Sequence, residues 1–115
     1  EQGDAEAQYS IGTMYIKGEG VLQDYAEALK WFRLAAEQGH AGGQYFLAAM
    51  YEFGKGVLQD NVMAHMWLNI VSANGDKDAG ERRDKIAGLM TPADISKAQS
   101  MAKECMSSNY KNCDW

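Results

Sequence analysis

One seven-residue stretch occurs twice in this chain and constrains the fold more than any other feature. Its copies are residues 18–24, Gly-Glu-Gly-Val-Leu-Gln-Asp, and residues 54–60, Gly-Lys-Gly-Val-Leu-Gln-Asp. Each copy follows an aromatic-rich segment with helical spacing and precedes a segment that carries alanine and tryptophan. Because glycine adopts the backbone conformations that end and reverse a helix, each copy predicts the turn of a helix–turn–helix unit. The period is about 36 residues, which is typical of a helical repeat protein.

The agreement between the two units extends beyond the turns. We predict helices over about 4–17 and 24–38, with equivalent helices 36 residues later, and Asp24 as the N-cap of the second helix. In that helix Ala28, Trp31, Phe32 and Ala35 are expected to face inward. Many positions of the second unit repeat the residue about 36 positions earlier: Ala41, Gln44, Tyr45, Met50, Tyr51, Ala64, Trp67 and Gly75.

The third unit breaks this register. Residues 76–90 have helical composition, and Ile86, Leu89 and Met90 are expected to form their apolar side. Thr91-Pro92 is a typical helix start, with Thr91 as N-cap and Pro92 at the first helical position. The apolar stripe predicted for that last helix is Ile95, Ala98, Ala102 and Cys105. We therefore interpret the third unit as a cap that closes the array with a wetter outer face.

Size and charge exclude several function classes. The chain has 115 residues, one proline and a formal net charge of −5, which predicts one domain without disordered linkers. No basic cluster is present to bind nucleic acid, and no apolar run is long enough for membrane insertion. The opening Glu1-Gln2-Gly3 is repeated as Glu37-Gln38-Gly39, so we interpret the chain as an excerpt of a longer repeat protein.

The first unit carries a family pattern: Ala5-x-Ala7-Gln8-x-x-Ile11-Gly12-x-x-Tyr15-x-x-Gly18-x-Gly20-Val21-x-x-Asp24-x-x-x-Ala28-x-x-Trp31-x-x-x-Ala35-Ala36-x-x-Gly39. This pattern closely resembles the Sel1-like repeat, from which the second unit departs locally at Gly43, Ala48 and His65. The resemblance implies an all-α fold, an α-solenoid of antiparallel helix–turn–helix repeats in a right-handed superhelix. We expect repeats at 4–39 and 40–75, a C-terminal capping helix pair at 76–108 and a tail at 109–115. The resemblance also implies a scaffold or adaptor for a protein or peptide partner.

Motifs that suggest chemistry are incomplete. Gly18-x-Gly20 follows no strand, so it is not a phosphate-binding loop, and Ser100-x-x-Lys103 lacks the partner motifs of penicillin-recognising enzymes. His40 and His65 fit no zinc spacing, and Asp76-x-Asp78-x-Gly80 lacks the glutamate of a calcium loop. We predict a non-enzymatic protein with no cofactor and no metal. The alternatives are an intracellular signalling or quality-control adaptor of the same fold, and a hydrolase or β-lactam-binding protein.

The two cysteines, Cys105 and Cys113, lie near the end of the chain. Helix termination near Ser108 would let the tail fold back and bring the two sulfur atoms together, and two free thiols are the alternative. Many proteins that carry Sel1-like repeats are exported bacterial proteins. The resemblance therefore favours a disulfide and a periplasmic or secreted location, and the cytoplasm stays open.

A second apolar stripe distinguishes the two units. Phe46, Ala49, Met50 and Phe53 follow each other at steps of three and four, whereas the first unit has Ser10, Thr13, Met14 and Lys17 there. First helices line the concave side of helical-repeat solenoids, where partners bind. We predict a groove for a peptide or an apolar helix, bordered by Tyr9, Met14, Tyr45, Phe46, Met50 and Phe53. The alternative is that an interior helix simply buries two faces.

Overall fold

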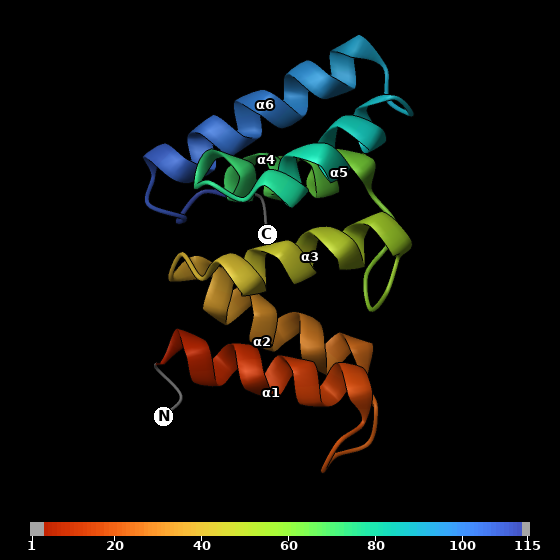
Figure 1. Cartoon of the computed structure of the whole chain (residues 1–115), viewed down its shortest axis with the longest axis vertical. Helices are drawn as coiled ribbons and strands as arrows, with labels where there is room; N and C mark the ends of the chain where they lie inside the picture. Colours follow the sequence, from red (N-terminus) through yellow and green to blue (C-terminus); the bar gives the residue numbers. More distant parts are fainter. Residues whose placement is uncertain (1–3, 114–115) are drawn as a thin grey trace.

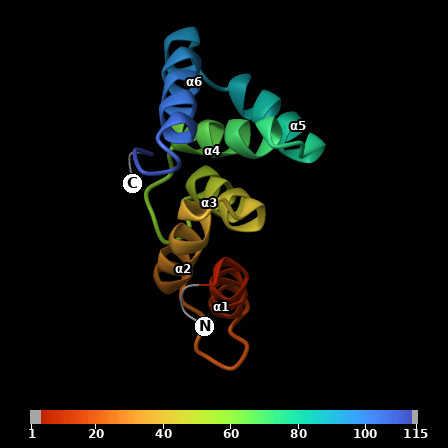
Figure 2. The same cartoon turned by 90° about the vertical axis from the view of Figure 1, so that its left-hand side faces the viewer.

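The computed structural model describes residues 4–113, which form six helices and no strand. The helices are α1 (Ala5–Lys17), α2 (Tyr25–Glu37), α3 (Ala41–Phe53), α4 (Asn61–Ala73), α5 (Lys77–Ala87) and α6 (Pro92–Ser107). They form an elongated stack of 43 × 26 × 24 Å, and its long axis is vertical in Figure 1. In Figure 2, α1, α3 and α5 share one side, α2 and α6 lie on the other, and α4 runs between α3 and the α5–α6 pair. The all-α solenoid predicted from the sequence is confirmed.

The repeated turns end and restart helices as their residues predict. Gly18 and Gly54 take left-handed backbone conformations, with φ of 71° and 67°, and their N–H groups donate to carbonyl oxygens of the last helical turn. The side chain of Asp24 caps α2 by accepting from the Glu27 N–H, and Asp60 caps α4 in the same way. The N–H of each aspartate also donates back to the preceding helix, Asp24 to Tyr15 at 3.0 Å and Asp60 to the equivalent tyrosine at 2.9 Å.

The core is centred on α4, which packs against α3, α5 and α6, whereas α2 packs mainly against α1 and α3. Trp67 of α4 is completely buried, but Trp31 at the equivalent position of α2 is only half-buried. The expectation that Trp31 faces inward is therefore met only in part, because its side chain stays partly exposed to solvent. The reason is that α3 covers α2 as α5 covers α4, but no described helix makes an extensive contact with α2 as α6 does with α4. Phe32 is the buried aromatic of α2.

In the third unit the helix start predicted at Thr91 is confirmed, whereas the helix predicted over 76–90 ends earlier, at Ala87. Asp76 precedes α5, and the Thr91 side chain accepts from the Asp94 N–H at 3.1 Å before α6. Of the stripe predicted for α6, Ala98, Ala102 and Cys105 are fully buried. Leu89 was predicted to be apolar core, but it is 79% exposed. It lies beyond the end of α5 at Ala87, so helical spacing no longer determines its direction.

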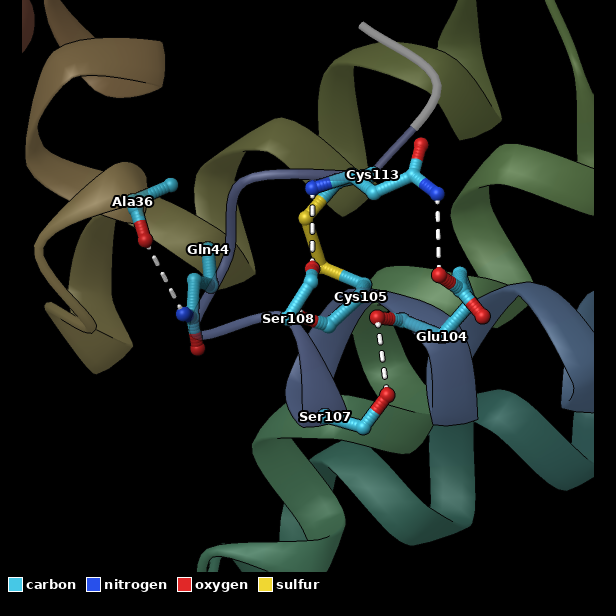
Figure 3. The surroundings of a disulfide bond; sticks show 8 residues. Ala36, Gln44, Glu104, Cys105, Ser107, Ser108 and Cys113 are labelled. Carbon is cyan, nitrogen blue, oxygen red and sulfur yellow. Dashed lines mark hydrogen bonds between the residues drawn. A yellow bond between two sulfur atoms is a disulfide. The ribbon is translucent and has the colours of Figure 1, made fainter.

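The tail folds back on α6 and is joined to it by a disulfide between Cys105 and Cys113 (Figure 3). Asn109 and Tyr110 take left-handed conformations, and the Tyr110 N–H donates to the Cys105 carbonyl at 2.8 Å. Further hydrogen bonds join Asn112 to Ser108 and Glu104. The Tyr110 ring reaches the turn between α2 and α3, where a Cβ on Gly39 would lie 3.3 Å from it. The tail thereby contacts the end of the first repeat.

Candidate protein-interaction surface

An apolar strip runs along the outer face of α3. Gln44, Leu47, Ala48 and Tyr51 form the buried face of this helix. Phe46, Ala49 and Phe53 follow each other at steps of three and four on the opposite face, so their side chains share one surface. Phe53 is 60% exposed, and Phe46 and Ala49 are half-buried. We call Phe46, Ala49 and Phe53 the α3 strip.

An aromatic cluster supports the strip on its α1 side. The Phe46 ring stacks on Phe32 of α2, with a centroid distance of 4.9 Å and an interplanar angle of 4°. The Tyr9 ring of α1 lies 5.9 Å from each of these rings. Because aromatic contacts of this kind add to the stability gained by burial, they hold Phe46 in one orientation.

His40 ties this cluster to the start of α3. Its Nδ1 accepts from the Gly43 N–H at 3.1 Å, as an N-cap, and its Nε2 lies 2.8 Å from Oε1 of Glu6. Its ring centroid is 4.7 Å from that of Tyr9. A neutral imidazole with its proton on Nε2 satisfies both hydrogen bonds, so His40 acts as a structural link between α1 and α3.

Polar contacts support the strip on its α5 side. The hydroxyl of Tyr45 donates to Oδ2 of Asp78 at 2.6 Å, and Arg82 forms an ion pair with Glu52. The guanidinium carbon of Arg82 lies 5.8 Å from the centroid of the Phe53 ring, within cation–π range. Burial, and then the hydrogen bond to Asp78, raise the pKa of Tyr45 to about 12, so this hydroxyl remains a neutral donor at physiological pH.

The predicted groove residues do not all meet. Tyr9, Tyr45, Phe46 and Phe53 lie on or beside the α3 strip, but Met50 is 2% exposed and belongs to the core. Met14, which is 38% exposed, lies against the first turn, where a Cβ on Gly20 would be 3.4 Å from its Cε. The pattern of the sequence did not reveal Glu52, Asp78 and Arg82 as part of the surroundings. In the sequence, only the spacing of Asp78 and Arg82 by four residues points to them, because it places both on one helix face. The break in register concealed that this face contacts Tyr45 and Glu52 of α3.

Comparison with known proteins identifies the repeats. The family model of the Sel1 repeat matches residues 5–40 and 41–76. The chain belongs to the Sel1 repeat family. Proteins of this family are generally scaffolds for protein interactions. A search of curated proteins found no match.

Two solved structures are similar to this Sel1 repeat chain. One is c5321, a protective antigen of uropathogenic Escherichia coli with an SLR fold, at a TM-score of 0.88 and 28% identity. The other is a Sel1 repeat protein from Oxalobacter formigenes, at a TM-score of 0.70 and 36% identity. The similarity covers 95% and 72% of this chain but only 24% and 62% of those proteins, so the chain spans a part of each.

The residues of the incomplete chemical motifs in the Sel1 repeat chain lie on the surface or cap a helix. Ser100 and Lys103 are exposed on α6, and Asp76 caps α5 by accepting from the Ala79 N–H at 3.1 Å. Within residues 4–113, no three His, Cys, Asp or Glu side chains are grouped so that they could hold a metal ion. None of the helices described between these residues is both long enough and apolar enough to cross a membrane.

Proposed function

We propose that this chain is a non-enzymatic scaffold that binds a peptide or protein segment along the α3 strip. The observation that carries the proposal is the 60% exposure of Phe53 in the middle of the array. The equivalent position of α1 is Lys17, so the Sel1 fold does not require an aromatic side chain there. A large exposed aromatic side chain on a rigid helix is typical of a residue that contributes strongly to binding.

The surroundings suit the strip for an apolar ligand. Phe46 is held by its stacking on Phe32, so little side-chain freedom is lost when a partner covers it. The small side chain of Ala49 leaves room between the two phenylalanines for an aliphatic or aromatic side chain of the partner. Arg82 and Glu52 at the edge offer hydrogen bonds to a peptide backbone.

Export to an oxidising compartment is the second part of the proposal. The disulfide between Cys105 and Cys113 supports a periplasmic or secreted location, because disulfides persist mainly in oxidising environments. Mass spectrometry of unreduced protein, alkylated at the moment of cell lysis, should find no free thiol. Two alkylated cysteines in the native host would contradict this location.

A random peptide library, displayed on phage and selected against the wild-type chain, tests the proposed binding surface. Phe53→Lys introduces the residue that α1 carries and should weaken binding of the selected peptides at least tenfold. Leu58→Lys is the matched control: Leu58 is 88% exposed but lies in the second turn, so this change should leave binding unaltered. Peptides that bind Phe53→Lys as tightly as wild type would contradict the proposal.

A further inference from the structure

Two charged flanks border the α3 strip, one on α1 and one on α5. The only charged residue of α3 itself is Glu52, which forms an ion pair with Arg82 of α5. The three helices lie on one side of the stack in Figure 2, and they run in the same direction in Figure 1. The charges beside the strip therefore come mainly from the neighbouring helices, and their order along each helix gives the strip a direction.

The α1 flank runs from acidic to basic. Glu6, Ser10, Thr13 and Lys17 follow each other at steps of three and four, so they lie on one face of α1. Oε1 of Glu6 lies 2.8 Å from Nε2 of His40, so this face is turned toward the start of α3. Lys17, at the other end, is exposed and occupies the position that corresponds to the end of the strip. This flank places a carboxylate beside the beginning of α3 and an ammonium group beside its end.

The α5 flank has the same order. Asp78, Arg82 and Lys85 are spaced by four and three residues on one face of α5. Asp78 and Arg82 both contact α3, so this face borders the strip. Glu81 adds a second carboxylate before Arg82, and the charge of Arg82 is balanced by Glu52. This flank is therefore negative beside the beginning of α3 and positive, through the exposed Lys85, beside its end.

The apolar surface between the flanks suits a helix better than an extended chain. An α-helix pairs its backbone groups internally, so α3 offers an extended peptide no backbone hydrogen bonds along the strip. Such a peptide would cover the strip with unpaired N–H and C=O groups of its own, whereas a helix satisfies these groups itself. The small side chain of Ala49, between two phenylalanines, leaves a notch in which a side chain of a second helix packs.

We propose, on the basis of the function proposed for the α3 strip, that its partner is an amphipathic helix which lies antiparallel to α3. Helices commonly carry acidic residues in the first turn and basic residues in the last, because these charges suit the helix dipole. Both α1 and α5 follow this rule. When a partner helix of this kind runs opposite to α3, its acidic first turn lies beside Lys17 and Lys85. Its basic last turn then lies beside Glu6 and Asp78.

The backbone dipole of the partner acts in the opposite sense but is weaker. It corresponds to about half a unit charge at each helix end, positive at the N-terminus, so by itself it favours the parallel direction. Two side-chain charges at each end of the partner exceed this half charge. The side chains therefore decide the direction.

Two stapled helical peptides of equal composition test the direction. Each has about four turns and one leucine stripe, and each carries a nitroxide at its N-terminus. The acid-first peptide has two glutamates in its first turn and two lysines in its last, and the base-first peptide has the reverse. In the wild-type chain, the nitroxide of the acid-first peptide should broaden amide signals at the Phe53 end of α3. That of the base-first peptide should broaden signals at the His40 end, because its charges match the flanks only in the parallel direction.

Reversing the basic end of the flanks tests the cause. Lys17→Glu with Lys85→Glu should weaken binding of the acid-first peptide about three- to tenfold in fluorescence anisotropy, and its nitroxide should no longer select one end. Lys97→Glu with Lys103→Glu is the matched control. It makes the same charge change at exposed positions of α6, on the other side of the stack in Figure 2, and it should alter neither result.

Phe53→Ala, which adds no charge, separates the direction from the binding surface. It should weaken binding of both peptides. Binding that is equally tight in Phe53→Ala would overturn the α3 strip as the surface, and the antiparallel helix with it. Binding that depends on Phe53 would overturn the antiparallel helix alone if the acid-first peptide broadened signals at the His40 end or equally at both ends. Indifference to Lys17→Glu with Lys85→Glu, or failure of both peptides to bind, would also overturn the antiparallel helix, while the selection from the random library still decides on the strip.

Discussion

Trp31 and Trp67 stand at the same position of two successive Sel1 repeats, yet only Trp67 is completely buried. The helices that carry them have the same length of 13 residues and begin after the same aspartate cap. The difference lies outside the repeat, since α5 and α6 cover α4 and no described helix covers α2 in this way. In a solenoid, the contribution of a residue to stability is thus set by the neighbouring unit as well as by its own sequence.

The largest effect is expected from truncating the two tryptophans. Trp67→Ala removes a fully buried indole and should lower the free energy of unfolding by about 3–5 kcal/mol. Trp31→Ala removes a partly buried side chain and should cost about 1–2 kcal/mol, because part of its surface already contacts water. Urea titrations followed by circular dichroism measure both values. Equal losses would show that α5 and α6 do not cause the difference between the repeats.

Opening the disulfide tests how much the closed tail of the capping unit contributes to stability. Cys113→Ser should lower the free energy of unfolding by roughly 2–3 kcal/mol, the value expected for a short closed loop. The tail should loosen while the helices remain, because the caps and core of α6 do not depend on Cys113. Thermal unfolding of the variant and of reduced wild type should agree. Complete loss of helical circular dichroism in the variant would contradict this division of roles.

His65 offers an exchange of residues between the repeats, since the first repeat has Leu29 in its place. His65 is 3% exposed, and burial, followed by the charge of Arg83, lowers its pKa below the ordinary 6.5. The unfolded chain therefore takes up a proton at a higher pH than the folded one, so stability is full above about pH 6.5 and falls below it. In His65→Leu this loss should be absent. Urea titrations at several pH values between 7.5 and 5 measure the free energy of unfolding of both proteins. If this free energy depends on pH in the same way in both, the result would contradict a buried neutral histidine.

The smallest effects are expected in the two turns. Lys55→Ala removes a contact with the Tyr25 ring and should cost about 0.5–1 kcal/mol, the range of an exposed cation–π pair. Glu19→Ala, at the equivalent exposed position, should change stability by no more than about 0.5 kcal/mol. Denaturant midpoints of the two variants under identical conditions provide the comparison. A larger loss for Glu19→Ala would mean that Glu19 makes a stabilising contact within the folded chain.

The repeated pattern predicted those parts of the fold that depend on local residues. Asp24 and the glycines of the turns have fixed roles, because capping and left-handed backbone need particular residue types. The exposure of Trp31 and Leu89 was not predictable in this way, since it depends on where the covering helices end. On the candidate surface, helical spacing placed Phe46 and Phe53 on one face. Only the packing of Phe32 determined that Phe46 is half-covered and Phe53 is not.

The most direct measurement for the proposed scaffold function is a map of amide chemical-shift changes in the wild-type chain when a library-selected peptide is added. The largest changes are expected along α3 at Phe46, Ala49 and Phe53, with smaller ones at Tyr9 and Arg82 on the neighbouring helices. Changes confined to the turns, or to α6, would contradict the assignment of the α3 strip as the surface that binds the partner.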